Sequence, residues 1–319
     1  MIGLILVAAL AAAGLVLLFA YGQSYAKRAE AIWPAQGRFI ESRGARVHVR
    51  EAGPNDAPRI FFIHGASANL RELWGPLAGP LKQDHHVVAL DRPGYGYSAR
   101  PRGAEKLALQ AAIAADVLKQ TGDGPAIVVA HSLGAAVALR LALDRPELVS
   151  GLVLIAPASH PYPGNNVWWA RLAATPLAGH IFAGAVVPLV GPVMAGSGVA
   201  ANFYPASAPR GYYEDAGVGL IFRPRAFRAS ARDVVATKRE FPAQAPRYPE
   251  IMTPAIVITA EKDKIVSPKL HARGLARDLP ACELVIAPDT GHMPHRLRPD
   301  LVLAAIRRIA SMVEAPAEG

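Results

Sequence analysis

The sequence predicts an α/β fold in which a mostly parallel, twisted sheet is flanked by helices. Short apolar runs alternate with longer segments of helical periodicity over most of the chain, as expected when parallel strands are joined by helical crossovers. Hydrophobic residues make up 52% of the 319 residues and charged residues 18%, a composition that excludes a disordered chain. This length is sufficient for one large domain with an insertion, or for two domains at most.

The apolar runs define the strands that we expect, and the periodic segments define the helices. The predicted strands are Val47–Glu51, Ile60–His64, His86–Asp91, Ala126–His131, Val149–Ile155, Ala255–Thr259 and Glu283–Ala287. The predicted helices are Leu70–Leu81, Glu105–Thr121, Leu133–Leu143, Pro268–Asp278 and Pro299–Val313. In the last of these, apolar residues recur at the three- and four-residue spacing of one helix face.

The N-terminus predicts a membrane anchor. Residues 2–21 contain no charged side chain, and twenty residues at about 1.5 Å rise form a helix of roughly 30 Å, the thickness of a bilayer core. A secretory signal peptide cleaved near residues 24–26 is the alternative, but no basic residue precedes the run and the run exceeds the usual length. Lys27 and Arg28 follow the run, which favours a cytoplasmic domain; a cleaved signal would instead place it in the periplasm or outside the cell.

The predicted domains follow from these features. Residues 1–22 form the transmembrane anchor and 23–36 a juxtamembrane linker, so a truncated chain starting near Gln36 is expected to stay soluble and active. Residues 37–158 and 250–319 form the α/β core. The alternation of strands and helices is interrupted over 159–249, a segment rich in glycine, proline and aromatic residues. It is too long for a simple loop, so we expect a helical lid over the carboxyl edge of the sheet, although a packing layer without substrate contact remains an alternative.

Charge and cysteine content restrict the ligand classes. The net charge is +9, but the 34 Lys and Arg residues are dispersed and match no nucleic-acid-binding module. A mild preference for anionic membrane surfaces, or simply solubility, accounts better for this charge. The single cysteine, Cys282, excludes an internal disulfide and a cysteine-rich zinc site. We expect neither a cofactor nor a metal, and the sequence does not indicate an oligomeric state.

A candidate nucleophile lies where an apolar strand runs directly into an alanine-rich helical pattern. Residues 127–136 read IVVAHSLGAA, with Ser132 at the junction. A tight strand-to-helix turn requires small residues two positions before and after the serine, here Ala130 and Gly134. Such a turn raises the serine hydroxyl above the sheet edge, beside the backbone N–H groups of the next helix. An ordinary helix N-cap is the alternative interpretation of Ser132.

Serine requires a base, and His292 is the best candidate. It follows the last predicted strand in a short loop that precedes the final helix, so its imidazole can reach the same sheet edge. His295 is the rival, but we expect it to begin the helix or line the entrance. His131 adjoins the serine, and adjacent side chains diverge.

A carboxylate must orient that imidazole, and Asp263 is the predicted partner. It lies shortly after the strand Ala255–Thr259, at the edge expected for His292. Glu261 is closer to the strand end, and Asp289 is too near His292 in sequence to reach around it. A solvated charge between two lysines is the alternative for Asp263.

Together these motifs resemble the α/β-hydrolase superfamily, over roughly residues 37–315 and most weakly across the lid. The serine motif resembles the G-x-S-x-G nucleophile elbow, with Ala130 in place of the first glycine, and the order Ser132, Asp263, His292 is that of the superfamily. The sequence HGAS at 64–67 looks like its His-Gly motif, which implies an oxyanion hole from the backbone N–H groups of Ala66 and Leu133 and a structural role for His64. DRPGYGYS at 91–98 resembles a further loop that is structural in the superfamily.

The resemblance implies a serine hydrolase that cleaves a carboxylic ester or related acyl compound, by a carboxylesterase- or lipase-like mechanism. The apolar, aromatic-bearing lid and the anchor favour a hydrophobic small-molecule substrate near a membrane. A serine nucleophile disfavours the epoxide-hydrolase and haloalkane-dehalogenase branches. Carbon–carbon hydrolases and perhydrolases share the triad and remain alternatives, as does a pigment- or partner-binding protein resembling the accessory proteins of magnesium chelatase.

Overall fold

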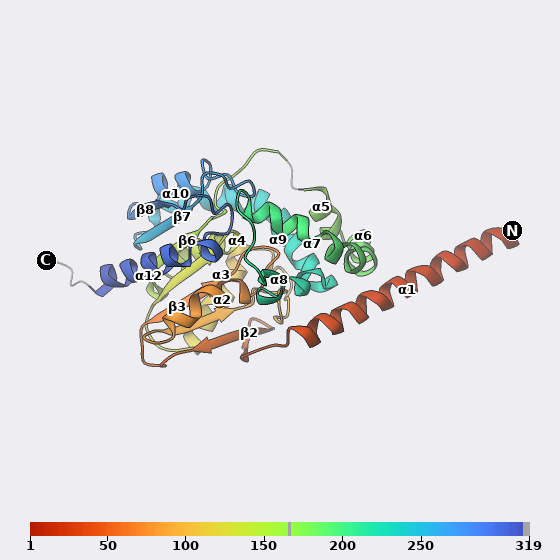
Figure 1. Ribbon diagram of the computed structural model, residues 1–319, viewed down its shortest axis with the longest axis horizontal. Coiled ribbons are helices and arrows are strands. Elements are labelled where there is room, and N and C mark those ends of the chain that lie inside the picture. The colour runs from red at the N-terminus through yellow and green to blue at the C-terminus, as the bar shows by residue number, and fades with distance from the viewer. Residues whose placement is uncertain (165–166, 315–319) are drawn as a thin grey trace.

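An eight-stranded sheet with helices on both faces forms the centre of the computed structural model, which describes residues 1–164 and 167–314 (Figure 1). The strands lie in the order β1-β2-β4-β3-β5-β6-β7-β8, and all pairs are parallel except β1 with β2 and β2 with β4. Their bounds are β1 Arg38–Ser42, β2 Ala45–Ala52, β3 Arg59–Ile63, β4 His86–Leu90, β5 Ala126–His131, β6 Val149–Ile155, β7 Ala255–Thr259 and β8 Cys282–Ile286. The predicted α/β fold with a mostly parallel sheet is therefore confirmed.

Helices connect and cover these strands. The core helices are α2 Arg71–Leu81, α3 Leu107–Gln120, α4 Leu133–Asp144, α10 Ala272–Asp278, α11 Pro294–Leu297 and α12 Pro299–Glu314, with the short 3-10 helix η1 at Pro146–Leu148. Between β6 and β7 lie α5 Trp168–Ala174, α6 Leu177–Ile181, the π-helical η2 Phe182–Val186, α7 Val187–Phe203, α8 Tyr212–Asp215, η3 Val218–Phe222, α9 Pro224–Gln244 and η4 Ala245–Glu250. These helical elements fall in the range predicted as a lid, and we refer to residues 159–249 as the lid segment.

Each predicted strand is present to within a few residues, and among the strands of the described residues only β1 was not predicted. The short RFIES run of β1 carries two charges and has only Ile40 and Ser42 buried. It pairs antiparallel with β2 at the edge of the sheet. An edge strand with one half-buried face has too few apolar residues to be recognised by periodicity alone.

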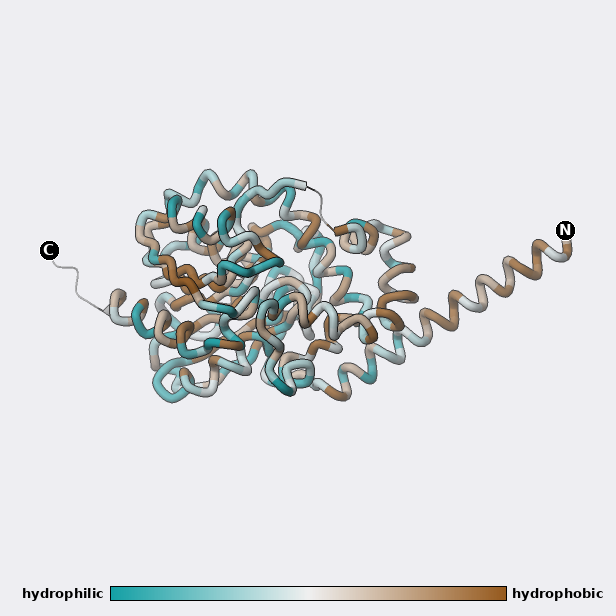
Figure 2. The backbone as a smooth tube through the Cα atoms, turned by 45° about the horizontal axis from the view of Figure 1, so that its top comes forward, coloured by the Kyte–Doolittle hydropathy of each residue, from teal (hydrophilic) through white to brown (hydrophobic). Residues whose placement is uncertain are grey.

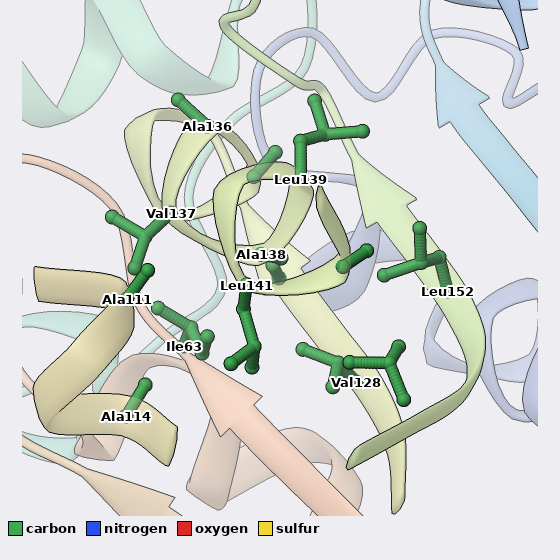
Figure 3. Packing of buried hydrophobic residues seen from close by; sticks show 14 of the residues in the cluster. Ile63, Ala111, Ala114, Val128, Ala136, Val137, Ala138, Leu139, Leu141 and Leu152 are labelled. Carbon is green, nitrogen blue, oxygen red and sulfur yellow. The ribbon is translucent and has the colours of Figure 1, made fainter. Parts of the chain in front are cut away.

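The core consists of two apolar layers, one on each face of the sheet. One layer joins α3, α4 and α10 to the inward side chains of the central strands, and Figure 3 shows α4 residues such as Leu141 packed near Val128 of β5 and Ile63 of β3. The other joins α2 and α12 to the opposite side chains of the same strands. Strands covered on both faces hold their carboxyl ends rigidly, and those ends position the polar loops described below.

The first helix, α1 Ile2–Ile32, is longer than the predicted anchor and continues through most of the segment predicted as a linker. Its N-terminal part extends away from the body of the protein and carries predominantly hydrophobic residues (Figures 1 and 2). Among the described residues, two segments are long and apolar enough to cross a membrane, α1 and Leu177–Phe203. In the most apolar window of the second, 33% of residues are buried in the protein, against 0% in α1. The second segment therefore packs partly as a lid element.

The last turns of α1 are docked onto the lid segment. Tyr25 donates a hydrogen bond from its hydroxyl to the Gly219 carbonyl at 2.9 Å, and the Trp33 indole N–H donates to the Glu214 carbonyl at 2.8 Å. A Cβ atom at Gly219 would collide with the Trp33 ring, so the indole lies directly against the backbone of η3. Residues 25–33 thus belong structurally to the folded domain rather than to a free linker.

This packing leads us to expect that truncation before Ser24 is tolerated, whereas truncation before Gln36 is destabilising. The second truncation removes a nearly buried indole and its hydrogen bond to the lid, which we expect to lower the free energy of unfolding by about 3–5 kcal/mol relative to the first. Urea denaturation of the two truncated chains measures the difference. Equal stability would mean that the contacts of residues 25–33 contribute nothing, in agreement with the simpler division predicted from sequence.

Candidate active site

Ser132 lies in a sharp turn between β5 and α4. Its backbone has φ 53° and ψ −122°, a conformation that costs free energy for any residue other than glycine. The surrounding hydrogen bonds hold it there, since the Ser132 N–H donates to the Ile155 carbonyl at 2.9 Å and the Ser132 carbonyl accepts from Ala158. A strained serine between a buried strand and a helix N-terminus has the geometry of a nucleophile elbow.

Small residues make this turn possible. A Cβ atom on Gly134 would collide with the carbonyl oxygens of Ile63 and His64, and one on Gly65 would lie 2.9 Å from the Cβ atom of Ser132. Ala130, which replaces the first glycine of the motif, is fully buried, so its methyl group is accommodated in the sheet. The loop after β3 therefore passes directly over the serine.

The structure brings Ser132, His292 and Asp263 together. The Ser132 hydroxyl lies 3.0 Å from His292 Nε2, and His292 Nδ1 lies 2.7 Å from Asp263 Oδ2. The side chains of His292 and Asp263 are buried, with exposed fractions of 4% and 0%. In this dry environment the Nδ1–H donates to the carboxylate, which leaves Nε2 as the acceptor for the serine hydroxyl.

The alternative carboxylates point elsewhere. Asp263 also accepts hydrogen bonds through Oδ1 from the N–H groups of Ile265 and Val266, at 2.8 and 3.0 Å, which fix its orientation. Glu261 and Asp289 are exposed and pair with surface cations instead. Of the three acidic residues considered from sequence, only Asp263 contacts the imidazole.

The two predicted oxyanion donors belong to the segments flanking Ser132. Leu133 is the first residue of α4, and Ala66 lies in the loop after β3. The next residue of that loop, Ser67, is tied to the lid segment, because its N–H and its hydroxyl each lie 3.0 Å from the Ser230 hydroxyl of α9. Lid and loop are thus directly connected beside the serine, while the catalytic roles of Ala66 and Leu133 stay predictions.

His64 has the contacts of a structural residue. Its Nδ1–H donates to the Gly65 carbonyl at 2.8 Å, and its Nε2 accepts from the Arg92 N–H at 3.0 Å. Burial, followed by repulsion from Arg92, lowers the pKa of His64 to about 4, so the ring is neutral at neutral pH. These contacts hold the loop after β3 against the loop after β4 and leave no proton on Nε2.

Behind the imidazole lies a buried polar cluster that the sequence analysis did not identify. Glu72 of α2 accepts hydrogen bonds from the Tyr212 hydroxyl at 2.8 Å, from His295 Nε2 at 3.0 Å and from Arg296 Nε at 2.8 Å. His131 packs between His295 and the base, with ring centroids 4.5 Å and 4.8 Å away. His131 Nε2 also lies 3.0 Å from the His292 carbonyl oxygen. The cluster thereby joins α2, α8 and α11 to the loop that carries His292.

Only one signal in the sequence could have indicated this cluster, the HxxHR spacing at 292–296. The carboxylate of the cluster, Glu72, lies in α2, more than two hundred residues before this segment. Nothing in the local sequence of α2 indicates that Glu72 is buried. His295 was expected either to begin a helix or to line the entrance. It lies in the short helix α11, and its side chain is fully buried, so it does not line an entrance. His131 contacts the base through its backbone and ring rather than replacing it.

The described residues hold no group of three or more His, Cys, Asp or Glu side chains arranged to bind a metal ion. The candidate site consists of the Ser132 hydroxyl, the His292 imidazole and the Asp263 carboxylate, which lie within hydrogen-bonding distance of one another in that order. This combination of fold and geometry defines a hydrolase of the α/β type.

Comparison with known proteins agrees with this assignment to the α/β-hydrolases. The sequence profile described as the alpha/beta hydrolase family matches residues 60–305, so the chain belongs to that family. The 2-(acetamidomethylene)succinate hydrolase of Mesorhizobium japonicum is 26% identical over 272 residues, covering 84% of this chain and 93% of the relative.

Two further relatives match over shorter regions. Lipase LipV of Mycobacterium tuberculosis is 40% identical over 112 residues, which cover 35% of this chain and 42% of the lipase. The dihydrolipoyllysine-residue acetyltransferase component of the acetoin cleaving system of Cupriavidus necator is 37% identical over 120 residues, 38% of this chain. The matched region spans only 32% of that component.

Among solved structures, a bacterial membrane phospholipase A described as a virulence factor aligns with a TM-score of 0.70 at 21% identity. The alignment covers 99% of this chain and 98% of that structure, including the region of α1. At this identity the likeness establishes a shared fold.

We expect Glu72→Gln to destabilise the protein in a pH-dependent way. Burial alone would raise the pKa of Glu72, but Arg296 and His295 outweigh it and hold this pKa well below its usual range. A carboxylate with a depressed pKa contributes stability above about pH 4.5, which is lost as the pH falls towards the folded-state pKa. At pH 7 the variant should lose about 3–5 kcal/mol, because Arg296 is left without its buried partner.

Chemical denaturation at pH 7 and at pH 4 measures the free energy of unfolding of the variant and of the native protein. The difference between these two free energies should be smaller at pH 4 than at pH 7. Glu261→Gln is the matched control, since it removes an exposed ion pair with Arg273 that contributes about 1 kcal/mol or less. A Glu72→Gln difference that is the same at both pH values would contradict the depressed pKa.

Proposed function

We propose that this chain is a membrane-anchored serine hydrolase that cleaves a hydrophobic carboxylic ester through an acyl-enzyme on Ser132. The observation that carries the proposal is the continuous hydrogen-bonded chain from Ser132 Oγ through the His292 imidazole to Asp263, with contacts of 3.0 and 2.7 Å. A buried chain of these three groups activates a hydroxyl that is otherwise a weak nucleophile.

In the acylation step, Ser132 Oγ attacks the carbonyl carbon of the ester while His292 Nε2 accepts the hydroxyl proton. Negative charge develops on the carbonyl oxygen, to which we expect the N–H groups of Ala66 and Leu133 to donate hydrogen bonds. The bond to the alcohol oxygen then breaks, and the imidazolium returns its proton to the leaving alkoxide. Asp263 stabilises the imidazolium without becoming protonated.

In the deacylation step, a water molecule attacks the acyl carbon and passes a proton to His292 Nε2. The bond to Ser132 Oγ breaks, the carboxylic acid leaves, and the serine regains its proton from the imidazolium. Atoms balance with water as the only co-substrate. The chemistry requires no group beyond the residues already described.

Two features favour a hydrophobic substrate. The lid segment carries exposed apolar residues, among them Trp168 of α5 and Val193 of α7 with exposed fractions of 70% and 84%, and α7 packs against α1. Family relatives named as a lipase and, among solved structures, as a membrane phospholipase act on lipids by name. An acyl chain delivered from a bilayer fits this arrangement better than a polar metabolite.

The apolar part of α1 supports a membrane location. Its exposed residues have no cover in the described part of the chain and would be unfavourable in water. Lys27 and Arg28 directly after this part favour a cytoplasmic catalytic domain. Cleavage near residues 24–26 as a signal peptide would remove the apolar run and leave the Trp33 contact with the lid segment in place.

Ser132→Ala should lower kcat on an activated ester by about four orders of magnitude or more, because the nucleophile is removed while the oxyanion donors remain. A fluorophosphonate probe should label the native protein and not this variant. Ser311→Ala, which changes an exposed hydroxyl of α12, is the control and should keep full labelling and turnover. Undiminished turnover in Ser132→Ala would remove the serine mechanism and favour a binding protein of the same fold.

Hydrolysis of p-nitrophenyl esters should become more efficient as the acyl chain lengthens. Each additional buried methylene contributes about 0.8 kcal/mol, so kcat/KM is expected to rise by about fourfold per carbon until the site is filled. The measurement compares acetate, butyrate, octanoate and dodecanoate under one set of conditions. A preference for acetate, or no hydrolysis of any ester despite fluorophosphonate labelling, would direct attention to carbon–carbon hydrolase or perhydrolase chemistry.

A further inference from the structure

A large basic pocket lies between α1 and the lid segment, separate from Ser132 and its partners. Its volume is about 1280 Å³, and it is bounded by Phe19, Gln23, Ala26 and Glu30 of α1 on one side and by the outer face of α9 on the other. None of the residues placed in the candidate active site lines it. The proposed hydrolysis leaves this pocket without a role.

Cations dominate its lining. Eight Arg and Lys side chains border the pocket, against the two carboxylates of Glu30 and Glu105. Arg223 pairs with Glu30 at 2.6 Å, and Arg100 pairs with Asp233 at 2.7 Å. The remaining six cations are Arg102, Arg225, Arg228, Arg232, Lys238 and Arg239. Arg239 contacts Glu240 at 3.2 Å, so a substantial positive charge is left even after these pairs are formed.

The positive charge is concentrated on one face of α9. Arg228 and Arg232, one turn apart, face the pocket, whereas Ser230 and Asp233 face the core, where Asp233 binds Arg92 and the Tyr95 hydroxyl. Burial, followed by repulsion from Arg232, lowers the pKa of Arg228. An anion in the pocket would relieve this repulsion.

The pocket has a defined position along α1. It begins at Phe19, where the apolar run ends, and extends to Glu30, a distance of about 17 Å along the helix axis. If residues 2–21 span the hydrocarbon core, this stretch lies at the level of the lipid headgroups. Exposed apolar residues of α6 and α7 flank the same region, where η2 packs against α1 at Gly22.

We propose that this pocket binds the phosphate headgroup of an anionic membrane phospholipid, with Arg102 and the arginines of the outer face of α9 as its ligands. The inference rests on the proposed anchoring by α1 and not on ester hydrolysis. Arginine suits this role, because its planar guanidinium donates two parallel hydrogen bonds to phosphate oxygens. The lipid would bridge the anchor and the lid segment, with its acyl chains beside α1 and α7.

The test uses the full-length protein in a non-ionic detergent, with phosphatidylglycerol or phosphatidylcholine of identical acyl chains added. Native mass spectrometry at about 150 mM salt, where only short-range charge interactions persist, counts the bound lipids. The native protein should retain phosphatidylglycerol at least about tenfold better than phosphatidylcholine, given about fivefold for each basic residue near an anionic group. Equal retention of the two lipids would overturn the proposal.

Arg102→Glu combined with Arg232→Glu should abolish the preference, and the milder Arg102→Gln with Arg232→Gln should weaken it if the first variant folds poorly. Lys269→Glu combined with Arg307→Glu is the matched control, with the same change of charge on surfaces outside the pocket lining. A preference that persists in the folded pocket variant, or is equally lost in the control, would also overturn the proposal.

Further measurements separate the possible explanations. Inorganic phosphate at millimolar concentration should not displace the lipid; displacement would make the pocket a site for free phosphate. Hydrolysis of a soluble p-nitrophenyl ester should be unchanged within about twofold in the pocket variants, while Ser132→Ala should keep its lipid. Flotation of the native chain with phosphatidylcholine vesicles tests the anchor alone, so failure of the anchor and failure of the headgroup site give different results.

Discussion

The turn at Ser132 is the constraint on which the rest of the site depends. It places an L-residue at φ 53°, and it persists because the parallel strands on both sides of β5 and the N-terminal turn of α4 leave the chain no other course. The loop after β3 approaches Ser132 closely, which is possible only with glycine at positions 65 and 134. The conformation of the turn at Ser132 therefore depends on both the sheet around β5 and the loop after β3.

Site residues that a local sequence pattern marks were predictable from the sequence. Residues that are buried only by contacts between distant segments were not. Ser132, Asp263 and His292 each follow a strand of the parallel part of the sheet. Parallel strands gather their carboxyl ends at one edge, so three separate segments could be assigned to one site. Glu72 and Tyr212 carry no such signal. They are buried only because α2, α8 and α11 meet, and a single sequence does not specify which helices meet. The edge strand β1 was missed for a related reason, since its partner supplies most of its order.

The lid segment is fastened to the core by polar contacts rather than by apolar packing alone. Asp233 accepts hydrogen bonds from Arg92, Tyr95 and Gln110, all contributed by the core. These buried partners fix the rotation of α9 about its axis, because any other rotation would leave Asp233 or Arg92 charged and unpaired. The same rotation determines which residues of α9 face Ser67 and which face outward. The Asp233 carboxylate therefore determines which side chains lie on each of the two faces of α9.

The continuity of α1 has a mechanical consequence. One uninterrupted helix contains both the apolar run and the residues that pack on η3, and no glycine or proline hinge separates Tyr25 from Trp33. Because α1 is continuous, a change in the tilt of its apolar part also changes the orientation of the residues that pack on η3. In a bilayer of different thickness, the helix would accommodate the mismatch by changing its angle, and the lid would rotate with it. Bilayer thickness would thereby become a variable that acts on the position of the lid segment relative to the core.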